Sequence, residues 1–148
     1  MNLQKLQNVV QELKQARPIW FEMSFQEVID DCEIQNVEKK LSLLFPKEYK
    51  EVLKKFGGGD FAFTNIFSVK TESEWPLVEI NEKNEQIRQK NFLLISDEET
   101  GDFWGFKVEK GVCRSEIWFY NHDLDTWEKS KYENIFEYIL EIGLKQSL

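Results

Sequence analysis

Few residues of this chain could carry out covalent chemistry, and they lie far apart in the sequence. The single histidine, His122, stands in a polar turn, and the two cysteines are Cys32 and Cys113. Nucleophilic catalysis pairs a nucleophile with a base, and a structural zinc site needs four Cys or His ligands. Three such residues cannot build that zinc site. The fold could still bring a cysteine near His122, but we interpret His122 as a turn or surface residue and both cysteines as free, reduced thiols.

Carboxylates are far more numerous than these groups. The chain has 27 acidic and 19 basic residues, for a formal net charge of −8. Residues 97–102 and 123–125 resemble fragments of calcium loops, but neither has the span, the central glycine and the terminal glutamate of an EF-hand. Carboxylate pairs of the kind that hydrolyse glycosides occur by chance in so acidic a chain. We therefore predict that the protein uses no metal or cofactor and is not an enzyme.

The net negative charge indicates which classes of partner the protein could bind. Residues 97–148 alone hold 12 acidic and 6 basic side chains. A negative field repels nucleic acid and anionic membranes and favours a basic protein, although it could equally do no more than keep the chain in solution. Residues 1–16 lack the apolar core of a signal peptide, and no segment is long enough to span a membrane. We expect a cytoplasmic protein that binds neither nucleic acid nor membranes directly.

A glycine triplet, Gly57-Gly58-Gly59, invites comparison with a phosphate loop. Phosphate loops precede a helix N-terminus, whereas this triplet follows a helix and precedes a strand. The helix is predicted to begin with Pro46 at its first position and to end at Phe56, where Gly57 supplies a positive φ. The triplet is therefore predicted to reverse the chain, and we assign it no ligand.

The elements before this helix are predicted from apolar spacing and capping signals. Apolar residues at helical spacing predict an amphipathic helix over residues 2–16. Ser24 and Glu27 have the spacing of a capping box, which predicts a short helical turn through Ile29. Val37, Leu41 and Leu44 predict a further helix that continues to the proline.

The segments after the triplet are predicted mainly as strands. Residues 61–67 have the period of a strand, and residues 77–87 weakly predict a short helix. Further strands are predicted at residues 91–96, 103–108, 116–120 and 126–129, and Asn134 can cap a closing helix. Helices followed by strands favour an α+β fold: N-terminal helices, a mostly antiparallel sheet meander and a closing C-terminal helix. Residues 1–148 are predicted to form a single domain.

Tryptophans are the remaining candidates for a binding surface. Trp104, Trp118 and Trp127 lie in or beside predicted strands, where burial is the default expectation. Trp75 lies instead in a loop next to Pro76, among several glutamates. Because tryptophan is enriched at interface hot spots, Trp75 is a candidate anchor for a partner.

Two blocks of the sequence together resemble the SUKH superfamily, also called the Smi/Knr-type domain. The first block is the run FPKEYK that begins at Phe45, followed by the apolar helix and its glycines. The second is the run GDFWGF that begins at Gly101, preceded by the strand residues Leu94 and Ile95. A later strand, an Asp/His-containing turn and a closing helix follow in the family's order, so the resemblance covers about residues 33–144.

The resemblance implies an α+β fold and function by protein binding, and it brings no catalytic motif. Many bacterial members resemble immunity proteins that neutralise a cognate polymorphic toxin, often a nuclease, whereas fungal relatives act in cell-wall glucan synthesis and its regulation. We therefore expect a basic toxin as the partner, with a cell-wall interaction module as the alternative; the sequence does not set the oligomeric state. The candidate partner-binding residues are Trp75, Asp97, Glu98, Glu99, Asp102 and Asp123.

Overall fold

The computed structural model describes residues 1–24 and 29–148. The proposed capping box of Ser24 and Glu27 therefore lies mostly outside the described residues. Ser24 itself is described, and its Oγ accepts a hydrogen bond of 3.1 Å from the backbone N–H of Ala62. This contact ties the N-terminal part of the chain to the region that follows the glycine triplet.

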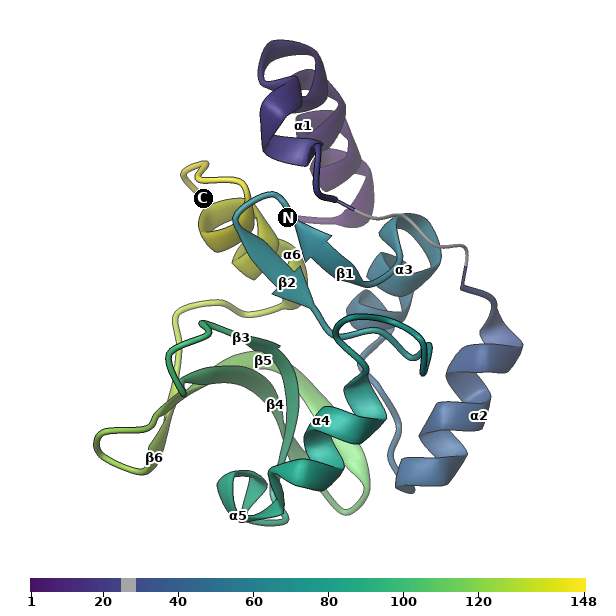
Figure 1. Cartoon of the computed structure of the whole chain (residues 1–148), viewed down its shortest axis with the longest axis vertical. Coiled ribbons are helices and arrows are strands. Elements are labelled where there is room, and N and C mark those ends of the chain that lie inside the picture. The colour runs from purple at the N-terminus through teal and green to yellow at the C-terminus, as the bar shows by residue number, and fades with distance from the viewer. Residues whose placement is uncertain (25–28) are drawn as a thin grey trace.

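Three N-terminal segments are helical. Helix α1 spans Leu3–Ala16 and buries Leu6 and Val10, and a 3-10 turn, η1, spans Pro18–Phe21. Helix α2 spans Asp31–Leu41 and starts earlier than predicted, because Asp30 and Glu33 form a reciprocal capping box. Helix α1 stands at one end of the molecule and α2 at its side (Figure 1).

The predicted extension of this second helix through Leu44 is wrong. Ser42 takes a left-handed conformation that ends α2, and Leu44 is 56% exposed. The Leu44 N–H donates to the carbonyl oxygen of Gly111 at 2.8 Å, and the Leu44 carbonyl accepts from the Cys113 N–H at 2.9 Å. The backbone of Leu44 therefore extends the sheet, and its helical spacing from Leu41 is a coincidence.

Helix α3, Lys47–Phe56, buries the predicted apolar stripe of Tyr49, Val52, Leu53 and Phe56. Pro46 occupies the N-cap position, one residue before the predicted place, because its ψ of 145° is not helical. Gly57 ends the helix with the expected positive φ, of 74°. A Cβ on Gly58 would lie 2.5 Å from the Cβ of Ser68, so only glycine allows this close approach.

The segment predicted as one strand over residues 61–67 is a hairpin, so that prediction is wrong. Strand β1, Gly59–Phe61, pairs antiparallel with β2, Thr64–Ile66. The turn places Ala62 at a φ of 50°, a conformation that alanine does not signal in a sequence. Phe63, the other turn residue, is exposed.

A four-stranded antiparallel sheet with order β3-β4-β5-β6 forms the second half of the fold. Its strands are β3 (Phe92–Asp97), β4 (Phe103–Glu109), β5 (Val112–Asn121) and β6 (Thr126–Lys129). Helices α4, Leu77–Lys83, and α5, Glu85–Arg88, precede the sheet, and α6, Ile135–Tyr138, follows it and continues as a π-helical turn, η2, over Ile139–Gly143. The predicted α+β fold class is confirmed.

Both faces of this sheet are covered. On one face the ring of Phe106 packs 5.6 Å from that of Tyr49 on α3. On the other, the indole N–H of Trp127 on β6 donates to the carbonyl oxygen of Ile87 on α5 at 2.8 Å. The buried Asn81 of α4 hydrogen-bonds both the N–H and the carbonyl of Leu94, which places α4 along the outer edge of β3. Helix α5 accordingly lies on the opposite side of the sheet from α6 (Figure 1). Within the described part of the chain, no helix combines the length and apolar character needed to cross a bilayer.

Candidate partner-binding site

A surface cavity lies between the β1–β2 hairpin and the turn that joins β3 to β4. Its volume is about 240 Å³. Three of the predicted site residues, Asp97, Glu98 and Glu99, line it together. The other lining residues come from the hairpin: Asp60, Ala62, Phe63, Thr64 and Asn65. We call this cavity the acidic pocket, since four of its eight lining residues carry carboxylates.

Indole N–H groups orient two of the pocket's carboxylates. Trp75 Nε1 donates to Asp60 Oδ1 at 3.0 Å, and Trp104 Nε1 donates to Glu98 Oε1 at 2.7 Å. An indole N–H is a neutral donor, so each bond directs a carboxylate without cancelling its charge. The two tryptophans therefore position negative charge at the pocket.

The third oriented carboxylate, Asp97, is held by amide groups. Its Oδ1 accepts from Asn65 Nδ2 at 3.0 Å and from the Glu99 N–H at 3.2 Å. The amide oxygen of Asn65 in turn accepts from the Asp97 N–H and from Ser96 Oγ, both at 3.0 Å. Asn65 is buried, so it joins the hairpin to β3 and fixes the position of Asp97.

A buried hydroxyl cluster supports this junction from below. The Tyr138 hydroxyl lies 2.7 Å from Thr64 Oγ1 and 2.8 Å from Ser96 Oγ. Burial raises the pKa of Tyr138 above its usual value, so its hydroxyl stays protonated. The hairpin, β3 and α6 are thereby connected beneath the pocket, which makes its floor rigid.

The pocket's carboxylates have no cationic partner within the described part of the chain. The ion pairs found there involve other acids, such as Glu38 with Lys50 and Glu141 with Lys131. Asp60, Asp97, Glu98 and Glu99 occur in none of them. Nor does any cluster of described residues meet the requirements of a metal site. The pocket's carboxylates are thus free of ion pairs within the part of the chain that the structure describes.

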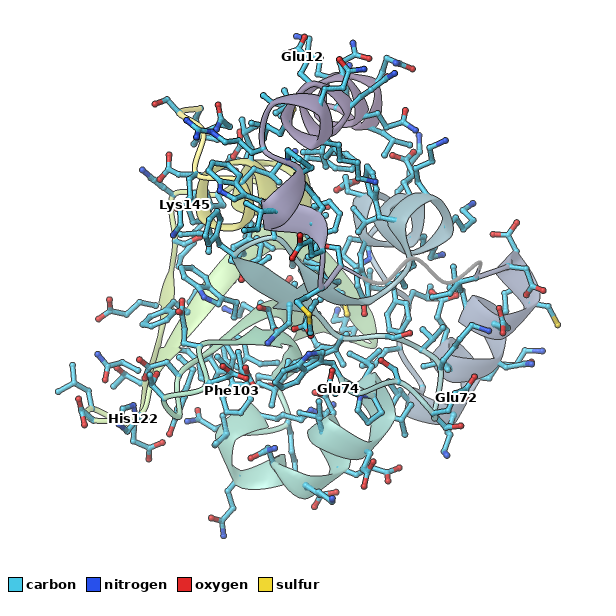
Figure 2. All side chains as sticks on the ribbon, turned by 45° about the horizontal axis from the view of Figure 1, so that its top comes forward. Glu12, Glu72, Glu74, Phe103, His122 and Lys145 are labelled. Atoms are coloured by element: carbon cyan, nitrogen blue, oxygen red, sulfur yellow. The ribbon has the colours of Figure 1, made fainter. Side chains whose placement is uncertain are left out.

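Asp102 and Asp123 do not line the pocket but lie around His122, although the Asp102 carbonyl accepts a bond from the Glu98 N–H. His122 Nδ1 lies 2.6 Å from Asp102 Oδ1, and Nε2 lies 3.2 Å from Asp123 Oδ1. The His122 backbone N–H also donates to Asp102 at 2.8 Å. That backbone bond and the side-chain bond lower the pKa of Asp102, and the side-chain bond raises the pKa of His122. Figure 2 shows His122 at the periphery, far from Lys145.

Trp75 does not line the pocket but holds one of its carboxylates, Asp60, by a hydrogen bond. It is half-buried, and its ring stacks on that of Phe67 with centroids 6.2 Å apart. Sequence reasoning missed Phe63, which fell within the single strand predicted over residues 61–67, and Asp60, which directly precedes it. A hairpin prediction would have placed Asp60 opposite Asn65, as the observed register does.

Comparison with known proteins supports the motif-based assignment. A search of curated protein sequences finds no match to this chain. The sequence profile described as SMI1-KNR4 cell-wall, SUKH_6, matches residues 31–139. That range includes α2, α3, both sheets and α6, and it leaves α1 and η1 outside. Because this match covers well over half of the chain, the chain belongs to the SMI1-KNR4 (SUKH) family.

Proposed function

We propose that this protein is a binding module that neutralises a basic protein toxin in the cytoplasm, with the acidic pocket as its contact surface. Domains of this family are generally binding modules without enzymatic activity, and the family fits either an immunity role or a Smi1/Knr4-like role. The observation that carries the proposal is the set of four pocket carboxylates, three of which are oriented by neutral donors and none of which forms an ion pair among the described residues.

The physical argument starts from the charge. Carboxylates gathered without counter-ions raise the local negative potential and attract positively charged partners at long range. A nuclease must hold a polyanion, so its active cleft is basic and complements such a surface. Complementary charges mainly increase the rate of association and the choice of partner. A nuclease toxin is therefore the partner class that we propose, and the same field disfavours direct nucleic-acid binding by this protein.

Cell-wall regulation is the second candidate function. The observation in its favour is the description of the matching family profile, which names the cell wall. In that case the pocket would contact a synthase or a signalling protein of the host. Affinity capture from the native host separates the two functions: a toxin supports the first, and cell-wall synthases support the second.

Co-expression with a toxin encoded by a neighbouring gene provides the direct test. We define a pocket-neutral variant, Asp97→Asn, Glu98→Gln and Glu99→Gln, whose amides keep an oxygen acceptor. The matched control variant, Glu12→Gln, Glu82→Gln and Glu128→Gln, makes the same change in net charge at exposed residues elsewhere. We expect the wild type and the control to restore growth and the pocket-neutral variant to fail. No rescue by the wild type, and no complex, would refute the proposal.

A further inference from the structure

We infer that Phe63 is the apolar anchor of this surface and that it selects a partner segment in which an apolar side chain stands between a basic and an acidic one. The inference rests on the proposed function of the acidic pocket and adds the chemistry of the partner. It starts from the position of Phe63, which lines the pocket and is 49% exposed.

The backbone around Phe63 is held in place. Its N–H donates to the carbonyl oxygen of Gly143 at 3.0 Å, and the preceding Ala62 N–H donates to Ser24 Oγ. The edge of the Trp20 ring packs against Phe63 with centroids 4.9 Å apart. A positioned aromatic side chain loses little conformational entropy on binding, which is a property of interface hot spots.

Phe63 borders side chains of both charge signs. It lines the pocket together with four carboxylates. Lys145 Nζ lies 5.5 Å from the Phe63 ring centroid, and the Arg17 guanidinium lies 5.8 Å from the centroid of Trp20, whose ring packs against Phe63. Neither cation forms an ion pair within the described residues. Negative and positive side chains therefore meet at one exposed aromatic ring.

The presence of both charge signs beside Phe63 disfavours two classes of partner. A uniformly basic segment would meet Lys145 and Arg17 as like charges, which disfavours it. An anionic bilayer would meet the carboxylates as like charges and is disfavoured for the same reason. The complementary segment places its basic group in the pocket, its apolar group on Phe63 and its acidic group near Lys145.

The test uses a short synthetic peptide in which arginines precede a central phenylalanine and glutamates follow it. Its control is a scrambled peptide of the same composition. Titration of the full-length protein, followed by NMR shifts and the dissociation constant, should give binding about tenfold tighter for the ordered peptide. Phe63→Ala should weaken that binding about tenfold, and Lys145→Glu should remove the preference for the ordered peptide.

Two further variants keep the result interpretable. Phe63→Leu retains an apolar side chain and should bind more tightly than Phe63→Ala, and Leu124→Ala truncates an exposed apolar residue elsewhere and should bind as the wild type does. Equal binding of the two peptides, or equal binding by Phe63→Ala and the wild type, would overturn the inference. So would concentration-dependent self-association that Phe63→Ala abolishes. Rescue from the toxin by Phe63→Ala but not by the pocket-neutral variant would leave the proposed function standing and this inference refuted.

Discussion

The acidic pocket and the contact between α2 and α3 both depend on carboxylates, but their surroundings differ. At the helix contact, Glu38 is 6% exposed and accepts a 2.7 Å bond from the Phe45 N–H, and Lys50 Nζ lies 3.2 Å away. In the pocket, the donor to the Glu98 carboxylate among the described residues is the neutral indole N–H of Trp104. The presence or absence of a cation thus separates carboxylates that stabilise the fold from those left available to a partner.

The largest effect is expected at the helix contact. Glu38→Ala leaves the Phe45 N–H and the Lys50 ammonium without their acceptor, so the free energy of unfolding should fall by about 2–3 kcal/mol. Chemical denaturation measures this change. In contrast, Glu98→Ala should change it by less than about 1 kcal/mol. Equal losses at the two positions would remove the distinction between the two regions.

The next effect concerns the residue that joins the hairpin to β3. Asn65→Ala removes the amide that bonds Asp97 and Ser96, and it should lower the free energy of unfolding by about 1–2 kcal/mol. Because Asp97 then loses its orientation, binding of the basic partner should weaken as well. Asn36→Ala, on an exposed part of α2, serves as the control for denaturation and should be nearly neutral. Undiminished partner binding by a folded Asn65→Ala protein would show that the orientation of Asp97 is not required.

A smaller effect of opposite sign is expected within the pocket. The pocket-neutral variant removes repulsion between carboxylates that have no counter-ion, so it should raise the free energy of unfolding by about 0.5 kcal/mol at low salt. The gain should shrink as salt screens the charges. The matched control variant separates this local effect from the change in net charge. A clear loss of stability in the pocket-neutral variant alone would show that these carboxylates hold the fold together.

The smallest effect is expected at the exposed pair of Asp102 and His122. The pKa of His122 is raised above 6.5, so its stabilisation is present below that pH and is lost as the pH rises through the folded-state pKa. The pKa of Asp102 is lowered below 3.8, so its stabilisation is present above that pH and is lost as the pH falls through the folded-state pKa.

An NMR titration can follow this pair directly, because His122 is the only histidine of the chain. Asp102→Asn should return the pKa of His122 toward 6.5, while Asp125→Asn should have little effect. An unchanged titration of His122 in Asp102→Asn would show that the pair does not hold in solution. When His122 is protonated, it is a cationic partner for Asp102 and Asp123, whereas the pocket acids form no ion pair among the described residues. We therefore predict that Asp102 and Asp123 contribute less to partner binding than the pocket acids do.

The sequence predicted those elements whose signals are local. The buried stripe of α3, the sheet strands and the Asn134 cap could all be predicted from spacing and capping residues. The hairpin was missed because its turn uses Ala62 at positive φ, without the glycine or asparagine that normally marks such a turn. Leu44 was misplaced because helical spacing does not reveal where Ser42 ends a helix.

The candidate site was predictable only in part, for a related reason. Asp97, Glu98 and Glu99 are adjacent in sequence, so one loop was enough to bring them together. Asp60 joins them through the pairing of β1 with β2 and the packing of that hairpin against β3, which are long-range contacts. Long-range contacts also decide whether a carboxylate has a counter-ion. Glu33 is an example, because its Oε1 lies 3.0 Å from Nζ of Lys70, which is distant in sequence. The amino-acid composition gives the net charge, but it does not show which carboxylates are paired with a cation.

The rate of association with the toxin at low salt tests the role of the pocket most directly. Stopped-flow measurement should compare the wild type, the pocket-neutral variant and the matched control variant at two ionic strengths. Uncompensated carboxylates that steer a basic partner predict association at least about tenfold slower for the pocket-neutral variant at low salt, with the control within about twofold of the wild type. Equal rates for all three proteins, or an equal loss in both variants, would contradict a specific role for the acidic pocket.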